Sequence, residues 1–544
     1  MSDASWTLRE RHTALERLAR EGIELAVIGG GITGAGVLRD AALRGLSCAL
    51  FEREDFASGT SSHTSKMIHG GLRYIAEGQL GVTRESCLER ELLARLNPNL
   101  VHPLPFLFCA FENGLKPWQV VAGMSLYSAL SGFKSGFSLL SGDDVERLSR
   151  DVRKDILRRA ALYHDQQVDD ARIVLETVKD ARRVGAEAIS HADVVGFDKQ
   201  GERITGLRVR DRLSGREFSI RAGSVVNAAG PSADRVRELD AALAVHELRP
   251  AKGVHLVIER SRVHAEAAVA FQAPDKRHMF LCPYQDVHLI GTTDTFTDEI
   301  DEPTVTRKDL HYLLAATNRM FSSPPLVEHD VISVFAGVRP LVADAHAEVP
   351  ASSVSREHRI TLDPSGLLSV AGGKLTTHRH MSEQIVDRVL EQLGPERRRS
   401  LKPCQTKLRP LRADRFEFGA LQAELTQRFE LDPGSSARLI GSWGADAVAI
   451  FANAPPEQRR PIGSSRYYPC EVARAFSHEC AANLCDVLER RVRVAVFARG
   501  QGLPELAALA QVAAEVAGWD DARTRDEMQR YRELVQRRYR VQAS

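Results

Sequence analysis

Three glycines and one glutamate near the start of the chain have the spacing of a nucleotide-binding turn. Gly29, Gly31 and Gly34 form a G-x-G-x-x-G pattern, and Glu52 follows about 20 residues later. In such a turn the first glycine permits a tight bend, the second admits a pyrophosphate to the backbone, and the third lets a helix pack closely on a strand. A carboxylate at position 52 accepts hydrogen bonds from a ribose hydroxyl. These residues predict a dinucleotide site, and the pattern alone fits NAD and FAD equally well.

A second group of polar side chains begins just after this acid. Residues 58–66 are mostly Ser and Thr, and residues 69–74 read His-Gly-Gly-Leu-Arg-Tyr. Hydroxyl and backbone N–H groups at this density can surround a phosphate or a flavin. Because an ordinary linker would not carry the embedded histidine, arginine and tyrosine, we expect this segment to belong to the site.

The elements that position these residues follow from the apolar pattern. Residues 25–28 predict a strand, an alanine-rich helical pattern follows to about Leu43, and residues 48–51 predict a second strand that ends at Glu52. This order is that of a βαβ unit, whose helix N-terminus directs free N–H groups toward the phosphates. The sequence therefore predicts an α/β fold.

Length and composition limit the possible functions. A chain of 544 residues is too long for one core, so we expect two or three domains. Lys and Arg (73) balance Asp and Glu (72), which gives no global field that favours nucleic acid. The eight cysteines have no paired spacing, so we expect reduced thiols and no metal site. No apolar signal region or spanning segment is present, which predicts a cytoplasmic protein that can still contact a membrane surface.

Residues 69–74 also resemble the signature of the FAD-dependent, quinone-linked glycerol-3-phosphate dehydrogenases, within the flavoproteins that oxidise amines and alcohols. The resemblance recurs in order over residues 23 to 385. Its further motifs are Asp165 with 168–172, then 226–231, 252–255, 290–294, 336–341 and 371–377. The resemblance implies FAD rather than NAD.

The same resemblance implies a domain organisation. We expect an N-terminal helical extension at 1–22 and, over 23–400, interleaved FAD-binding and substrate domains. The first would be Rossmann-like, of the glutathione-reductase and amino-acid-oxidase type, and the second an antiparallel β-sheet. Residues 401–544 resemble the family's C-terminal helical domain, in which Leu484, Val487 and Leu488 would line one buried helix face.

The activity implied is oxidation of sn-glycerol 3-phosphate to dihydroxyacetone phosphate, by hydride transfer to FAD and delivery of the electrons to a membrane quinone. This chemistry requires an anion anchor, a base and positive charge near the flavin. Arg73 and Arg339 are the expected phosphate anchors, because a guanidinium binds phosphate through two hydrogen bonds. Lys374 serves the substrate or the flavin, and Tyr74 closes the pocket or donates to the phosphate.

For the base, we expect His69 first and His255 second. His69 lies four residues before Arg73 in the motif that the family uses for substrate. His255 follows a Lys-Gly turn and could instead orient the phosphate. His69, His255 and Arg339 form the predicted catalytic set.

The predicted FAD-binding residues come from several segments. They are Gly29, Gly31, Ile32, Thr33, Gly34, Glu52, Thr60, Ser61, Ser62, Ser65, Lys66, His69, Gly70, Gly71, Val194, Ala229, Gly230, Gly372, Gly373, Lys374, Leu375 and Thr376.

Two positions depart from the family pattern, and three alternatives remain. Ser232 replaces the usual tryptophan after the Asn-Ala-x-Gly-Pro turn, and His378 replaces a tyrosine. An oxidase that uses O₂ is disfavoured because the sizeable insertion of the glycerophosphate oxidases is missing. An amino-acid oxidase or dehydrogenase would need only one carboxylate anchor, and a non-catalytic FAD-binding module is the third alternative. A homodimer is also compatible with the sequence.

The uncharged stretch between Lys116 and Lys134 is a candidate for contact with the membrane surface. It is too short to span, but Trp118, Val121, Leu126, Tyr127, Leu130 and Phe133 fit one broad face of a helix. Lysines at both ends would meet lipid headgroups. The periodicity fits a helix packed on the protein's own core equally well, so both alternatives stay open.

Overall fold

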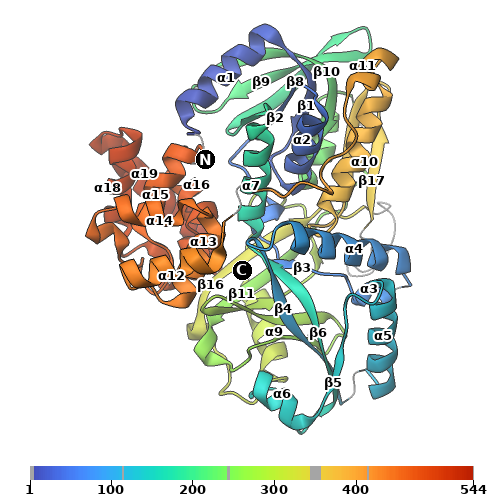
Figure 1. Ribbon diagram of the computed structural model, residues 1–544, viewed down its shortest axis with the longest axis vertical. Helices are drawn as coiled ribbons and strands as arrows, with labels where there is room; N and C mark the ends of the chain where they lie inside the picture. Colours follow the sequence, from blue (N-terminus) through green and yellow to red (C-terminus); the bar gives the residue numbers. More distant parts are fainter. Residues whose placement is uncertain are drawn as a thin grey trace.

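Two β-sheets and a set of C-terminal helices make up the protein (Figure 1). The computed structural model describes residues 5–76, 78–112, 115–241, 246–342, 357–412 and 416–542. Within these ranges no helix is long and apolar enough to cross a membrane.

The first sheet contains the nucleotide-binding turn. Its strand order is β17 (His358–Leu362), β18 (Leu367–Gly372), β10 (Glu217–Asn227), β1 (Ile23–Ile28), β2 (Cys48–Phe51) and β7 (Glu187–Ile189). In addition, β9 (Arg203–Asp211) pairs with β10, and β8 (Ala192–Gln200) pairs with β9. The strands from β18 to β7 are parallel. Helix α2 (Ile32–Arg44) packs against α7 (Asp170–Arg183) and α10 (His378–Glu391). The predicted βαβ unit is confirmed.

The second sheet is mostly antiparallel. Its order is β15 (Thr295–Phe296), β11 (Ala251–Glu259), β14 (Val287–Gly291), β13 (His278–Tyr284), β12 (Ala268–Gln272), β4 (Val101–Phe111), β6 (Leu157–Val168) and β3 (Met67–Ile68), while β16 (Val331–Arg339) pairs with β11 and β5 (Ser138–Leu140) with β6. Only β12 and β4 are parallel among the pairs described. The segments of the two sheets alternate along the chain.

Helices cover the sheets and form the C-terminal part. The remaining helices before residue 401 are α1 (Leu8–Glu21), α3 (Arg73–Ala76), α4 (Leu80–Leu96), α5 (Pro117–Leu130), α6 (Gly142–Leu148), α8 (Ala233–Glu238), α9 (Arg307–Asn318) and α11 (Pro395–Ser400). The C-terminal helices are α12 (Phe418–Phe429), α13 (Pro433–Trp443), α14 (Asp446–Asn453), α15 (Pro469–His478), α16 (Leu484–Asp486), α17 (Val494–Phe497), α18 (Leu506–Ala517) and α19 (Asp521–Arg538).

Buried ion pairs attach the C-terminal helices to the nucleotide-binding part. Arg490 and Arg491 both donate to the carboxylate of Asp55, at 2.6 Å each. The side chains of Leu484, Val487 and Leu488 are fully buried, as expected, although residues 487–491 form a π-helical turn rather than an ordinary α-helix. This turn brings the two arginines to the segment that follows β2.

Helix α5 forms where the uncharged stretch predicted it, with Pro117 at its first turn. Trp118 and Phe133 are 64% and 79% exposed, and Leu126 also faces outward. The structure corrects the placement of Tyr127, which is fully buried together with Val120 and Met124. Helical periodicity could not show which of two apolar faces turns inward, and α5 has both a buried face and an exposed one.

Candidate active site

The end of β1 and the start of α2 form the predicted nucleotide-binding turn. Gly29 has φ +104°, and a Cβ on Gly34 would lie 1.9 Å from the carbonyl oxygen of Gly29. The two oxygens of Glu52 accept the N–H groups of Gly30, at 2.6 Å, and Glu54, at 2.8 Å. Burial raises the pKa of Glu52, and the two N–H donors oppose that shift. The carboxylate is thereby fixed at the end of β2.

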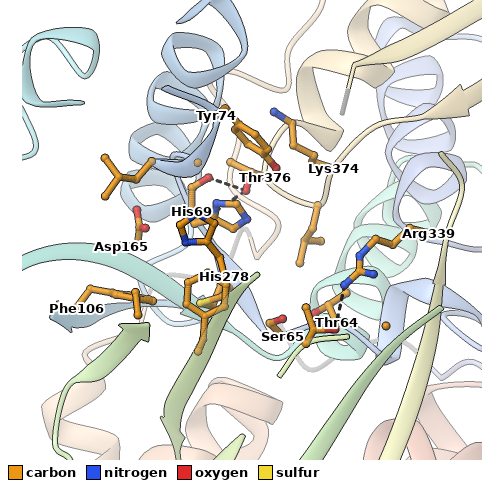
Figure 2. Close-up of a pocket in the computed structure, with 18 of the residues that line it drawn as sticks. Thr64, Ser65, His69, Tyr74, Phe106, Asp165, His278, Arg339, Lys374 and Thr376 are labelled. Carbon is orange, nitrogen blue, oxygen red and sulfur yellow. Dashed lines mark hydrogen bonds between the residues drawn. The ribbon is translucent and has the colours of Figure 1, made fainter. Parts of the chain in front are cut away.

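A cavity of about 450 Å³ lies beyond this turn, between the two sheets. Of the predicted residues it is lined by Thr60, Ser65, His69, Gly71, Tyr74, His255, Arg339, Gly372, Gly373, Lys374, Leu375 and Thr376. Figure 2 shows the side chains of His69, Tyr74 and Lys374 together on one side and Arg339 on the other. The structure thus gathers residues from segments more than 300 positions apart, since Thr376 and His69 are 307 positions apart and hydrogen-bonded.

Arg339 ends β16, and its guanidinium lies over a glycine of the neighbouring strand. A Cβ on Gly253 would lie 2.4 Å from the Arg339 Nη2 atom. Nη1 donates to the carboxylate of Asp294 at 3.0 Å, and Nη2 donates to the hydroxyl of Thr292 at 3.0 Å. The glycine in the Lys-Gly-Val-His motif therefore makes room for this cation.

His255 lies on β11 beside this arginine. Its Nε2 is 2.7 Å from the Ser65 hydroxyl, and its ring stacks on Phe335 with centroids 4.8 Å apart. Burial and then the charge of Arg339 lower its pKa to about 3, so the imidazole is neutral near pH 7. Its Nδ1 atom is buried with no hydrogen-bond partner among the described residues.

His69, Tyr74 and Lys374 form the opposite wall. The His69 backbone N–H donates to the Thr376 hydroxyl at 3.1 Å, which donates back to the His69 carbonyl at 3.2 Å. The Lys374 ammonium donates to Ser86 at 2.7 Å and lies 4.8 Å from the centre of the Tyr74 ring. The side chain of Arg73 lies outside the described residues, so its predicted role as an anchor stays a prediction.

The other predicted FAD-binding residues lie outside the cavity. Most surround the end of β1, where the Ser61 hydroxyl accepts the N–H of Ile32 at 3.0 Å. The Lys66 ammonium instead forms a buried ion pair with Asp170 and donates to the Ser62 carbonyl. Val194 belongs to an apolar core cluster. Their roles toward FAD stay predictions.

The cavity also contains residues that the sequence did not single out. His63 is one, and burial lowers its pKa to about 4. Asp165 lines the wall, although only its motif had been noted. An apolar part of the cavity is lined by Leu72, Ile75, Phe106, Phe108, Leu115 and Phe280. The spacing of these residues in the sequence does not show that they lie together, because their segments meet only when β4, β12 and β13 pair.

Comparison with known proteins agrees with this geometry. The sequence model of the FAD dependent oxidoreductases matches residues 24–379. The chain belongs to this family. A second model, the C-terminal domain of alpha-glycerophosphate oxidase, matches residues 404–524. The exact domain boundaries expected from the sequence stay predictions.

Relatives within the family are similar over most of their length. The glycerol-3-phosphate dehydrogenase of Mycobacterium leprae is 36% identical over 524 residues, which are 94% of this chain and 88% of the relative. The aerobic glycerol-3-phosphate dehydrogenase of Staphylococcus aureus is 34% identical over 89% of each chain. The glycerol-3-phosphate dehydrogenase structure from Bacillus halodurans, complexed with FAD, has a TM-score of 0.79 at 28% identity over 98% of each chain. The predicted resemblance, fold class and FAD cofactor are confirmed.

The residues present fit FAD. At the adenosine end, Gly34 leaves no space for a side chain beside the turn, and α2 begins at Ile32, after its N-cap Gly31, with its N-terminus toward the carboxyl end of β1. At the other end, Lys374 follows the glycines that close β18 and lies in the cavity wall. A cation there is suited to the edge of a flavin that becomes negative on reduction.

Proposed function

We propose that the chain oxidises sn-glycerol 3-phosphate to dihydroxyacetone phosphate, with FAD as the bound oxidant and a membrane quinone as the final acceptor. The observation that carries this proposal is the pairing of a neutral imidazole with fixed cations in one cavity. Arg339 is held by Asp294 and Thr292, and the buried His255 is beside it. A phosphorylated alcohol matches both features, because its phosphate can bind the cation and its hydroxyl can give a proton to the neutral imidazole.

In this proposal the chain's own residues bind and orient the substrate. Arg339 binds the phosphate, with Arg73 as a further anchor, and Lys374 on the opposite wall serves the substrate or the flavin. A histidine accepts the proton of the C2 hydroxyl, while the C2 hydrogen leaves with its electron pair. FAD supplies the acceptor for that hydride. We keep His69 as the first candidate for the base, and the position of the neutral His255 in the cavity wall beside Arg339 supports it as the second.

The apolar part of the cavity supports a quinone as the acceptor. Phe106, Phe108 and Phe280 line it, together with Gln119 and Gly123 of α5. Helix α5 also exposes Trp118 and Leu126, and the exposed Phe133 follows it. A planar apolar acceptor dissolved in lipid would meet this helix first. We therefore propose that α5 contacts the membrane surface.

The substrate is tested by anaerobic addition of sn-glycerol 3-phosphate to the purified yellow protein. We expect loss of the flavin absorbance at about 450 nm. Its enantiomer, glycerol and L-proline are the controls. Bleaching by proline but not by the phosphate would instead identify an amino-acid dehydrogenase, and no bleaching by any of them would leave a non-catalytic FAD protein.

The acceptor is tested by reoxidation of the substrate-reduced protein. We expect a long-chain quinone in liposomes to restore the yellow colour much faster than air-saturated buffer does. Faster reoxidation by O₂ would identify an oxidase. The double variant Trp118→Ser with Phe133→Ser should lose liposome sedimentation and quinone activity together while it retains activity with a soluble dye. Unchanged sedimentation would place the docking surface elsewhere.

A further inference from the structure

A buried carboxylate holds the backbone of the segment that carries His69. Asp165, on β6, accepts at its Oδ1 atom the N–H of Gly70 at 3.2 Å and the hydroxyl of Tyr127 at 2.8 Å. The same oxygen accepts a hydrogen bond from Arg90 Nη1 at 2.5 Å. Asp165 is 2% exposed, and Arg90 and Tyr127 are fully buried. The guanidinium therefore balances the buried charge, and the carboxylate remains a strong acceptor for the peptide N–H.

The space around Gly70 is filled by the same group of residues. A Cβ on Gly70 would lie 2.2 Å from the Tyr127 hydroxyl oxygen and 2.6 Å from the Cys87 sulfur. Burial and then the charge of Asp165 raise the pKa of Tyr127 well above its usual value, so its hydroxyl stays protonated and donates. The peptide between His69 and Gly70 is thus fixed by a hydrogen bond on one side and close packing on another.

One residue of the cluster around Gly70, Tyr127, belongs to the surface helix α5. Tyr127 lies on the inner side of α5, and Trp118 and Leu126 lie on its outer side. Past the helix, the second terminal nitrogen of Arg90 donates to the hydroxyl of Ser135. The C-terminal part of α5 and the segment just after it are therefore each hydrogen-bonded to the buried cluster that holds the Gly70 peptide.

We infer that Asp165 and Tyr127 are positioning residues, which set the place of His69 in the cavity and join that segment to α5. This inference rests on the proposed function, because it assumes that the cavity is the reaction site. Neither residue needs to touch the substrate. Their effect comes through the Gly70 peptide, since misplacement of a reacting group by about 1 Å can cost roughly a hundredfold in rate.

Two conservative variants test the inference. Tyr127→Phe keeps the ring and removes the hydroxyl, and Asp165→Asn keeps the shape and removes the charge. For each we expect kcat to fall about tenfold while KM changes by less than about threefold, because the phosphate anchors are untouched. Tyr531→Phe is the matched control, since it removes a buried tyrosine hydroxyl that donates to the Gln501 carbonyl at 2.6 Å in the same core cluster.

A second readout does not depend on turnover. In the FAD-loaded protein, hydrogen exchange of the peptide that contains residues 69–71 should be faster in Tyr127→Phe than in Tyr531→Phe, at equal FAD content and thermal midpoint. Exchange equal to that of the control would overturn the inference, and so would a kcat loss no larger than the control's. If Asp165→Asn does not fold, Tyr127→Phe alone decides. Failure of the proposed function would appear separately, as wild-type protein that no glycerol phosphate bleaches but whose exchange still responds to the Tyr127 change.

Discussion

The nucleotide-binding turn and the cavity differ in the chemical groups that they offer to a ligand. The turn uses backbone N–H groups and the absence of side chains, and its residues come from one continuous βαβ unit. The cavity is lined by charged and aromatic side chains from separate segments of both sheets, such as Arg339 at the end of β16, His255 within β11 and Lys374 just after β18. A change in the turn should therefore remove the cofactor, whereas a change in the cavity should leave the cofactor bound and alter the chemistry.

The largest effect is expected for Gly34→Ala. Its Cβ would lie 1.9 Å from the Gly29 carbonyl oxygen, so α2 cannot keep its place against β1. We expect purified protein without FAD, measured by the ratio of absorbance at about 450 nm to that at 280 nm. Gly81→Ala in α4 is the control, because its Cβ meets nothing within 4 Å. If the Gly34→Ala protein were still yellow, it would still contain FAD, and the proposed difference between the turn and the cavity would be wrong.

The next effect concerns the two histidines of the cavity. His69→Asn should keep FAD bound and slow substrate-driven bleaching by about 10² to 10⁴-fold, the range for loss of a general base. His255→Asn should also keep FAD and cause a smaller loss. Stopped-flow absorbance under anaerobic conditions measures both rates. The reverse order would make His255 the base, which its position beside Arg339 also allows.

Arg339→Ala should give a smaller loss that appears mainly in substrate affinity. Removing a charged hydrogen bond to phosphate costs about 1.5 to 3 kcal/mol, or roughly ten- to a hundredfold. Arg73→Ala should behave similarly. Arg262→Ala is a suitable control, because that arginine pairs with Asp330 elsewhere in the same half of the molecule. Titration of the bleaching amplitude with substrate measures the affinity, and near-normal values in both variants would rule out the proposed anchor.

The same contrast explains how much the sequence could predict. The βαβ unit was predictable because its glycines, strands and acid are close in sequence and each has a local physical reason. The hydrogen bond between His255 and Ser65 spans 190 positions, and neither residue alone indicates the other. Tyr127 was placed on the wrong face because helical periodicity defines a stripe but does not say what covers it. The role of Asp165 at Gly70 appears only when β6, α4 and α5 are assembled.

The last prediction concerns acid, because four buried imidazoles, two of them in the cavity wall, have lowered pKa values. Burial lowers the pKa of His255 from 6.5 to about 3 and the pKa of His63, His288 and His378 from 6.5 to about 4. Below pH 6.5 the unfolded chain binds protons at these imidazoles and the folded chain does not. The free energy of unfolding should therefore fall between pH 6.5 and 5, by about 2 kcal/mol for each such imidazole.

Denaturant unfolding of the FAD-loaded protein at pH 6.5 and pH 5 measures this loss. Carboxylates add little in this window, because in the unfolded chain they titrate mainly at about pH 4. His288→Gln provides the sharpest comparison, because this imidazole is outside the cavity and its Nε2 bonds the Val263 carbonyl at 2.8 Å. The variant should lose less stability on acidification than the wild type, while its FAD content stays the same. An equal loss in both proteins would mean that His288 does not remain neutral in the folded chain, and that burial of these imidazoles is not what makes the protein sensitive to acid.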